Sequence, residues 1–419
     1  MQSNYRPIDD YISLVDERNK DLKIDLLLGL TINKLFIPSV ANIVGANMRN
    51  YKIIRKNQFA CSIMQVRRDG KMPVALLQEF NEAIISQAYP VFEVKDENKL
   101  LPEYLMMWFS RPEFDREACF YAVGGVRGSL EWEDFCNMKL PVPSLETQRA
   151  IVAEYNTVKN RIALNNQLIQ KLEEAAQTIY KQWFLDFEFP FDFAQGKPDE
   201  NGKPYKSSGG KMVYNVELDK EIPEGWRIGA FSDILTLFSG FSFNGEEYSL
   251  NGGITVVRGE NVTEKGFRWN THKKWNKELP GRAKNCFLQP YDIIVGMDGS
   301  KVGKNWGIVS RYQLPLLLAQ RVSCLRSNKD FYQSFVYFSF YENRFENYVG
   351  QVHTGTSVPH ISGDQILEFP IIIPIEDLVK KFHENVVKFI DEIHNIIMEN
   401  EKLQELIDLI LSKMATIEN

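Results

Sequence analysis

Apolar side chains recur at alternating steps of four and three residues along two stretches of the chain. Such a repeat places them on one stripe of a helix and is typical of a coiled-coil seam. The first seam comprises Ile151, Tyr155, Val158, Ile162, Asn165, Ile169, Leu172, Ala176, Ile179 and Trp183. The second comprises Phe382, Val386, Phe389, Ile393, Ile396, Asn400, Leu403, Ile407, Ile410 and Met414. Each position lies 231 residues beyond its counterpart, so the pattern predicts two long helices and an internal repeat.

One asparagine interrupts each seam, Asn165 at the fifth position and Asn400 at the sixth. In a parallel pair in register, each asparagine would face an apolar residue. In an antiparallel pair Asn165 would face Asn400, and such a buried polar pair fixes register and orientation. We therefore predict an antiparallel helical spacer in which Asn165 and Asn400 set the register.

Shorter apolar runs, broken by Gly, Pro and Asn, fill the rest of the chain and favour mixed strands and short helices. Phe59–Met64 is strand-like, and Leu101–Phe109 is predicted as a helix that Pro102 begins. The predicted fold class is α+β, with two mixed α/β modules separated by the two helices. The predicted divisions are residues 1–143 and 223–369 for the modules, 144–190 and 370–419 for the helices, and 191–222 for the segment between.

The two modules show matching segments, which predicts that they are copies related by a pseudo-twofold axis. Phe59-Ala60-Cys61-Ser62 corresponds to Tyr291-Asp292-Ile293-Ile294, and Ser86-Gln87 corresponds to Ala319-Gln320. Gly125–Phe135 corresponds to Gly355–Ile366 with one insertion. Residues 191–222 are rich in Gly, Pro, Lys and Ser, so we expect an exposed linker there.

A length of 419 residues allows two or three domains. A hydrophobic fraction of 44% favours a globular protein. No apolar run reaches the roughly 18–20 residues of a membrane span, and the first ten residues lack a signal-peptide pattern. The scattered cysteines, which we expect to be reduced, are Cys61, Cys119, Cys136, Cys286 and Cys324. These features predict a cytoplasmic protein that does not engage a membrane.

Few residues form a recognisable catalytic motif. The loop Val123–Gly128 is the nearest approach to a phosphate-binding loop, and a turn accounts for it. His272, His353, His360, His383 and His394 show no metal-ligand spacing. We therefore expect no metal, no cofactor and no catalytic residues in this chain.

Local charge points to a polyanionic partner despite a net charge of −6. Residues 40–75 carry seven basic side chains against one acid, and residues 258–304 carry ten against five. Asp69-Gly70 is a hairpin-turn signal within the first cluster. Arginine suits guanine edges and lysine suits phosphates. The predicted DNA-binding residues are Arg49, Arg55, Lys56, Arg67, Arg68, Lys71, Arg258, Arg268, Lys273, Lys274, Ser300, Lys301, Lys304 and Arg321.

Several phrases together resemble the specificity subunit of type I restriction-modification systems. They are Leu140-Pro141-Val142-Pro143 followed by Gln148, the run Gln182–Phe187, the linker Asn201–Gly210, and Ile-Pro-Glu-Gly-Trp at 222–226. The resemblance covers essentially the whole chain. The first module departs from it, because it lacks the Pro-x-Gly-Trp opening of the second.

The resemblance implies two target-recognition domains that each read one half of a bipartite site in double-stranded DNA, with the paired helices setting the spacing. It implies two DNA methyltransferase (modification) subunits and a restriction endonuclease subunit as partners. S-adenosylmethionine, ATP and Mg would be bound by those partners. Two alternatives remain open: a DNA methyltransferase or nuclease with its own active site, and a coiled-coil adaptor that binds no DNA.

Overall fold

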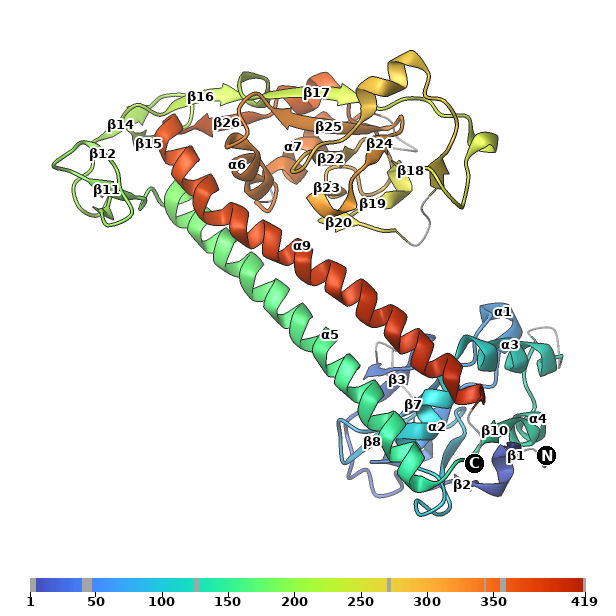
Figure 1. The fold of residues 1–419 in the computed structure, drawn as a ribbon. Coiled ribbons are helices and arrows are strands. Elements are labelled where there is room, and N and C mark those ends of the chain that lie inside the picture. The colour runs from blue at the N-terminus through green and yellow to red at the C-terminus, as the bar shows by residue number, and fades with distance from the viewer. Residues whose placement is uncertain are drawn as a thin grey trace. The chain divides into compact units, whose positions relative to one another are not determined.

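The computed structural model describes residues 5–39, 47–123, 128–269, 273–342, 344–354 and 359–416. They form two compact units, one running to residue 164 and including the chain from 400 onward, the other spanning 165–399. Each unit contains one mixed module and one part of each long helix (Figure 1). Sequence predictions that involve residues 124–127, 355–358 or His272 lie outside the described residues.

The two predicted long helices are present. The first, α5 (Leu145–Tyr180), continues into one π-type turn, η3 (Lys181–Leu185). The second, α9 (Glu376–Lys413), ends in a 3-10 turn, η9 (Met414–Thr416). Both helices are shorter than predicted. For α9 the reason is that strand β26 (Pro370–Ile373) occupies the expected start of the helix. Proline at 374 separates that strand from the helix, because proline cannot continue a ladder or a helix interior.

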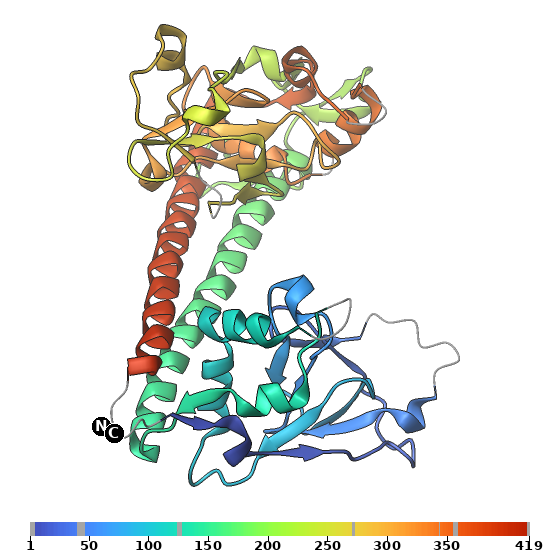
Figure 2. The ribbon, with the colours of Figure 1, turned by 90° about the vertical axis from the view of Figure 1, so that its right-hand side faces the viewer.

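The helices run antiparallel, as each unit shows by itself. In the first unit, Val158 near the start of α5 shares a core with Ile407 and Ile410 near the end of α9. In the second, the ring of Trp183, in the turn η3 that continues α5, lies 5.9 Å from the ring of Phe382 near the start of α9. Figure 2 shows α5 beside α9 in each unit. The predicted antiparallel orientation is therefore confirmed, and every seam position is buried or half-buried.

In its described residues, the first module consists of short strands and four short helices. Its strands are β1 (Tyr5–Pro7), β2 (Ile12–Val15), β3 (Leu28–Leu30), β4 (Phe36–Pro38), β5 (Lys52–Arg55), β6 (Phe59–Cys61), β7 (Val74–Leu76), β8 (Glu82–Ile85), β9 (Val91–Val94) and β10 (Lys139–Pro141). Its helices are α1 (Val66–Asp69), α2 (Pro102–Phe109), α3 (Pro112–Tyr121) and α4 (Trp132–Asn137), with 3-10 turns η1 (Ile8–Asp10) and η2 (Met48–Asn50). Helix α2 confirms the predicted Leu101–Phe109 helix, with proline at its first position.

The second module repeats this composition with more strands. Its strands are β16 (Arg227–Ala230), β17 (Leu235–Ser239), β18 (Ile254–Val257), β19 (Val262–Thr263), β20 (Gly266–Phe267), β21 (Lys273–Trp275), β22 (Ile293–Gly296), β23 (Trp306–Ile308), β24 (Leu316–Leu318), β25 (Val322–Ser327) and β26. Its helices are α6 (Tyr332–Ser339), α7 (Arg344–Val352) and α8 (Gly363–Leu367). The 3-10 turns are η4 (Phe231–Asp233), η5 (Gly245–Glu247), η6 (Gly259–Asn261), η7 (Gly281–Cys286) and η8 (Arg311–Gln313).

The main sheets of the two modules have the same topology. The strand order is β2-β9-β6-β7 in the first and β17-β25-β22-β23 in the second, and all neighbours are antiparallel. A two-stranded sheet at the base of each long helix also matches, β1 with β10 and β16 with β26. The internal repeat predicted from the sequence is therefore confirmed.

The sequence alignment of the two modules was wrong by two residues at one strand. Phe59 is paired with Phe92 and Leu76. The residue in that position of the second module is Ile293, which is paired with Leu325 and Ile308, rather than Tyr291. Tyr291 instead lies before the strand with φ +69°. Apolar runs alone do not show where a ladder begins, because register is set by pairing partners.

The aromatic core of the first module lies between its main sheet and helices α2 to α4. The rings of Phe59 and Phe92 are stacked with centroids 5.0 Å apart, and Phe109 of α2 meets Phe92 edge-on at 6.2 Å. The start of α5 is fastened to this core by Gln148, which is fully buried. Its amide accepts from the backbone of Leu101 at 2.9 Å and donates to the carbonyls of Lys99 and Pro143 at 2.9 and 2.8 Å.

The segment 191–222 is largely exposed, as predicted for a linker, but it has regular structure that its composition did not indicate. It forms two small sheets from β11 (Pro190–Asp192), β12 (Lys197–Pro198), β13 (Lys203–Pro204), β14 (Met212–Asn215) and β15 (Lys220–Pro223). Tyr205 stacks on Phe189 with ring centroids 4.5 Å apart, and Phe189 also stacks on Trp226 at 5.7 Å. A few well-spaced aromatic side chains therefore order a segment whose composition is otherwise that of a linker.

Candidate nucleic-acid interface

Two of the predicted basic clusters occupy equivalent positions in the duplicated sheets. Arg67, Arg68 and Lys71 lie in the connection between β6 and β7. Lys301 and Lys304 lie in the connection between β22 and β23, together with Ser300. Because β6 and β22 have the same place in the same strand order, the duplication presents both clusters from the same edge of each module.

A second segment joins each of these connections in the same way. The backbone N–H of Leu130 donates to the carbonyl of Ile63 at 2.9 Å. In the second module, Ile361 donates to Met297 at 3.0 Å. In each module, the segment that contains Leu130 or Ile361 therefore lies beside the strand connection that carries the basic residues. Two loops held by one sheet thus form a common surface.

The Asp69-Gly70 hairpin turn predicted in the first cluster is wrong. Residues Val66–Asp69 form the short helix α1 instead, and Gly70 ends it in the left-handed conformation with φ +66°. The strands on either side, β6 and β7, do pair as a hairpin would. A glycine that follows a charged residue suits a helix C-terminus as well as a two-residue turn, so the dipeptide alone did not distinguish them.

The other predicted residues of the first module lie on a separate small core. Arg49 is in η2, while Arg55 and Lys56 are at the end of β5. These elements pack around Ile53, which belongs to a different cluster of buried residues from Val66 of α1. Arg55 is also held between two carboxylates, Glu17 at 2.6 Å and Glu82 at 2.7 Å. The two groups are therefore carried by elements that pack on different cores.

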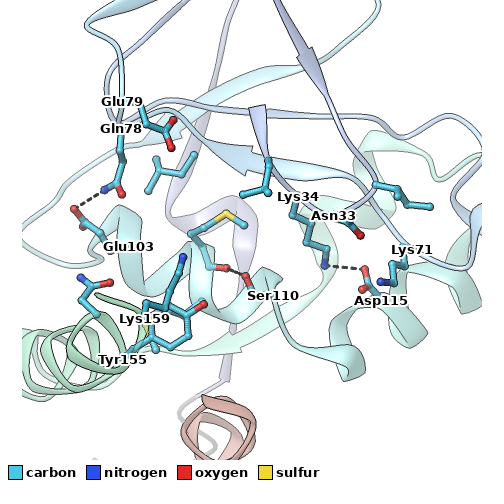
Figure 3. A pocket seen from close by; sticks show the side chains of 16 residues that line it. Asn33, Lys34, Lys71, Gln78, Glu79, Glu103, Ser110, Asp115, Tyr155 and Lys159 are labelled. Carbon is cyan, nitrogen blue, oxygen red and sulfur yellow. Dashed lines mark hydrogen bonds and ion pairs between the residues drawn. The ribbon is translucent and has the colours of Figure 1, made fainter. Parts of the chain in front are cut away.

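Lys71 lies at the wall of a hollow of about 340 Å³ in the first unit (Figure 3). Within it, the ammonium of Lys34 lies 2.8 Å from Asp115, and both side chains are nearly buried. Burial lowers the pKa of Lys34, and the hydrogen bond to Asp115 opposes that change. The same carboxylate accepts from the backbone of Met72 at 3.1 Å. Asp115 therefore anchors the chain directly after Lys71.

In the second module, acids partly neutralise the basic connection. Lys301 lies 3.6 Å from Glu264, and Lys304 lies 2.9 Å from Glu346. The hydrogen bond to Glu346 raises the pKa of Lys304, which keeps its charge. In the β6–β7 connection, Arg68 lies 2.8 Å from Asp69, whereas Arg67 and Lys71 form no ion pair with the described residues. The β6–β7 connection thus carries more uncompensated charge than the β22–β23 connection.

A second hollow, of about 410 Å³, lies in the second module beside this connection. It brings together two predicted residues that are far apart in sequence, Arg258 and Arg321. The guanidinium of Arg258 and the ammonium of Lys273 both lie 5.6 Å from the ring of Tyr248, which lines the hollow. Arg258 also pairs with Glu260.

Lys274 follows Lys273 on β21, and Arg268 is exposed after β20. Neither lines this hollow.

Sequence reasoning missed several residues of this hollow. Asp298 lies on its wall and receives a hydrogen bond or ion pair from Nδ1 of His360 at 2.5 Å. Gln320 and Asn305 line it as well. Gln320 could have been found from the sequence, because Ala319-Gln320 corresponds to Ser86-Gln87 in the internal repeat. His360 carried no signal, because its approach to Asp298 depends on chain folding across 62 residues.

The arrangement suits binding to a polyanion with local base recognition. Exposed lysines and arginines can contact phosphates, while the arginines and amides around the hollow offer donors and acceptors of the kind that read base edges. Among the described residues, no group of His, Cys, Asp and Glu side chains could hold a metal ion. The described helices include none that is long and apolar enough to span a membrane.

The comparisons with known proteins agree with this geometry. The type I restriction modification DNA specificity domain matches residues 40–174 and again residues 223–407. The chain is 26% identical to the type I restriction enzyme MjaIX specificity subunit of Methanocaldococcus jannaschii, over 75% of this chain and 68% of that protein. It is 20% identical to the HindI specificity subunit of Haemophilus influenzae, over 91% of each chain.

A solved structure shares the fold. The S subunit of a type I restriction-modification system from M. genitalium aligns over 99% of this chain and 96% of its own, with a TM-score of 0.59 and 15% identity. Since the specificity-domain match covers most of the sequence, and covers it twice, the chain belongs to the DNA specificity subunits of type I restriction-modification systems.

Proposed function

We propose that each module of this chain reads one half of a bipartite sequence in double-stranded DNA, and that α5 and α9 set the distance between the two halves. The observation that carries this proposal is the equivalent placement of basic residues in the duplicated sheets. Arg67, Arg68 and Lys71 follow β6 just as Lys301 and Lys304 follow β22. Two equivalent basic connections, one in each module, suit a site with two halves better than one continuous site.

The dimensions of the helices support this proposal. Helix α5 has 36 residues and α9 has 38. At about 1.5 Å per residue each is about 55 Å long. Major-groove sites one turn of DNA apart are separated by roughly 34–36 Å. A spacer of this length is compatible with half-sites one turn apart or somewhat more.

We also propose that this chain has no catalytic site and that it acts within a larger complex. Two modification subunits that use S-adenosylmethionine would dock on the helical spacer, and a restriction subunit that requires ATP and Mg would complete the system. The names of relatives support this assignment, since the two relatives named above are specificity subunits of type I restriction enzymes.

An exchange of modules tests the proposal. Residues 223–369 would be replaced by the equivalent module of a relative, and the hybrid expressed with the parent's modification subunits. Methylome sequencing should then show one half of the methylated sequence changed, with the other half and the spacing retained. A hybrid that changes both halves, or only the spacing, would contradict independent reading by the modules.

Two further assays address the alternatives. The chain alone, incubated with S-adenosylmethionine or Mg²⁺ and DNA, should neither methylate nor cleave; turnover would indicate an active site of its own. Binding to random duplex DNA should weaken steeply with salt, because phosphate contacts release counterions. A chain that binds no DNA at any salt concentration, alone or with its modification subunits, would instead be a coiled-coil adaptor.

A further inference from the structure

Arg321 combines an unusual backbone conformation with an exposed side chain at the rim of the second module's hollow. It stands in the short turn between β24 and β25 with φ +69°. Its side chain is 76% exposed. Left-handed backbone is unfavourable for a residue with a Cβ, and such conformations persist where the surrounding structure requires them. Here the carbonyl of Arg321 accepts from the backbone of Met297 at 3.3 Å, which ties the turn to the β22–β23 connection.

A carboxylate supports the guanidinium from one side. Oδ2 of Asp298 lies 3.9 Å from Nε of Arg321, while its Oδ1 is 2.5 Å from Nδ1 of His360. The backbones of Asp298 and His360 also form an antiparallel bridge. Nε is the guanidinium atom nearest the carboxylate, so the terminal nitrogens of Arg321 lie farther from it. A terminal fork of this kind can form a bidentate contact with O6 and N7 of guanine.

The surroundings provide a place for a base edge. Gln320 precedes Arg321 and is exposed, and both line the hollow of about 410 Å³. The side-chain amide of Gln320, which can both donate and accept, therefore lines the same hollow as the guanidinium of Arg321.

The first module differs at this position. The matching turn there reads Ser86-Gln87-Ala88, so alanine stands where the second module has Arg321. The glutamines are retained in both copies, but the guanidinium belongs to one copy alone. Whatever Arg321 recognises is therefore specific to the half-site of the second module.

We infer that Arg321 is the residue through which the second module recognises a guanine, and that Asp298 and His360 are positioning residues that aim it. The inference rests on the proposed function, since it assigns one base contact within the half-site that the second module reads. Gln320 borders the same contact and would complete the recognition of the neighbouring base.

The experiment compares Arg321→Ala, Arg321→Lys and Asp298→Asn with the parent chain, each assembled with the parent's modification subunits. Methylome sequencing gives the motif, and competition binding with single-base variants gives discrimination at each position. The parent should favour guanine over other bases at one position of one half-site by about 5-fold to 150-fold. Arg321→Ala should abolish that preference, and lysine should not restore it, because an ammonium lacks the bidentate fork. Asp298→Asn should reduce the preference at the same position only.

Arg227→Ala is the matched control. Arg227 is also an exposed arginine of the second module, on β16, and pairs with Asp233 at 3.1 Å. It should leave every position of the motif unchanged. The inference is overturned if folded Arg321→Ala, checked by circular dichroism, keeps the parent's motif, or if it relaxes several positions in both half-sites. A parent complex that methylates without a bipartite motif would instead refute the proposed function itself.

Discussion

The guanidinium of Arg326 holds the carboxylate of Asp292 through two hydrogen bonds, from Nε to Oδ1 at 2.8 Å and from Nη2 to Oδ2 at 2.6 Å. The same carboxylate accepts from the backbone of Gln289 at 2.7 Å, and Asp292 is 2% exposed. Asp292 directly precedes β22, whose far end leads to Lys301 and Lys304. The pair therefore fixes the strand from which the second basic connection emerges.

Removal of one partner of this pair should destabilise the second unit strongly. Asp292→Ala leaves a half-buried guanidinium without its carboxylate, which costs about 3–5 kcal/mol for a buried pair. Urea unfolding monitored by tryptophan fluorescence would measure the loss. Glu224→Ala is the control, since Glu224 pairs with Lys211 on the surface of the same unit. That change should stay within about 0.5 kcal/mol. Equal effects of the two substitutions would refute the proposed importance of Asp292.

The buried amide of Gln148 should also be difficult to replace. Gln148→Ala would leave the N–H of Leu101 and the carbonyls of Lys99 and Pro143 without their side-chain partner. We expect a loss of about 1–3 kcal/mol for each group left unsatisfied, reduced where water enters. Gln170→Ala, on the exposed face of the same helix, is the control and should have little effect. Thermal unfolding of both variants measures the difference, and equal melting temperatures would contradict it.

His394 should make the second unit acid-sensitive. Burial lowers its pKa from the ordinary 6.5 to about 4; Asp391 opposes this shift and Arg311 adds to it. The folded protein thus keeps the imidazole neutral, while the unfolded chain takes up a proton as pH falls below about 6.5. Stability from this residue is full above that pH and is lost progressively down to about pH 4, by about 3 kcal/mol in total.

His394→Leu tests this pH dependence. Nδ1 of His394 has no hydrogen-bond partner among the described residues, so an apolar side chain removes no bond made by that atom. Unfolding free energies of parent and variant should be compared at pH 7 and pH 4.5. The parent should lose more stability than the variant over this range, whereas parallel losses would show that His394 does not contribute. His383 is retained in both proteins and so cancels in the comparison.

Neutralisation of the two basic clusters should weaken DNA binding to different extents. Replacement of Arg67, Arg68 and Lys71 by glutamine should lower affinity and flatten the salt dependence, by about 0.9 in log–log slope for each phosphate that is no longer neutralised. Lys301 and Lys304 are already paired with glutamates, so their replacement should have a smaller effect. Fluorescence anisotropy of the complex with its modification subunits across a salt series would measure both. Lys99→Gln, at an exposed lysine paired with Asp96, is the control and should bind like the parent. Unchanged slopes for both cluster variants would refute this placement of the DNA surface.

The pairing of Asn165 with Asn400 stays a prediction, and a double-mutant cycle tests it. Asn165 is 2% exposed. If the two amides satisfy each other, either Asn→Ala substitution alone should cost about 1–3 kcal/mol. Replacement of both by apolar residues should cost less than the sum, and should loosen the register. A cycle with no coupling energy between the two positions would refute the pairing.

The sequence by itself determined the helices, their antiparallel orientation and the duplication. Each follows from a repeating spacing of apolar residues, and periodicity is a local property that can be counted along the chain. The two basic connections were also visible, since charges such as Arg67 and Lys301 are close to others in sequence. The family resemblance rested on short phrases of the same local kind.

Only the tertiary structure decided which of those charges are compensated and which residues meet across the hollow. Lys304 finds Glu346, and His360 finds Asp298, through folds that bring distant segments together. The ordering of residues 191–222 likewise depends on Tyr205 stacking on Phe189. Such contacts are set by the packing of whole elements, and no spacing along the chain specifies them. Composition alone therefore did not show that residues 191–222 are ordered, and charge alone did not show that Lys304 is paired with an acid.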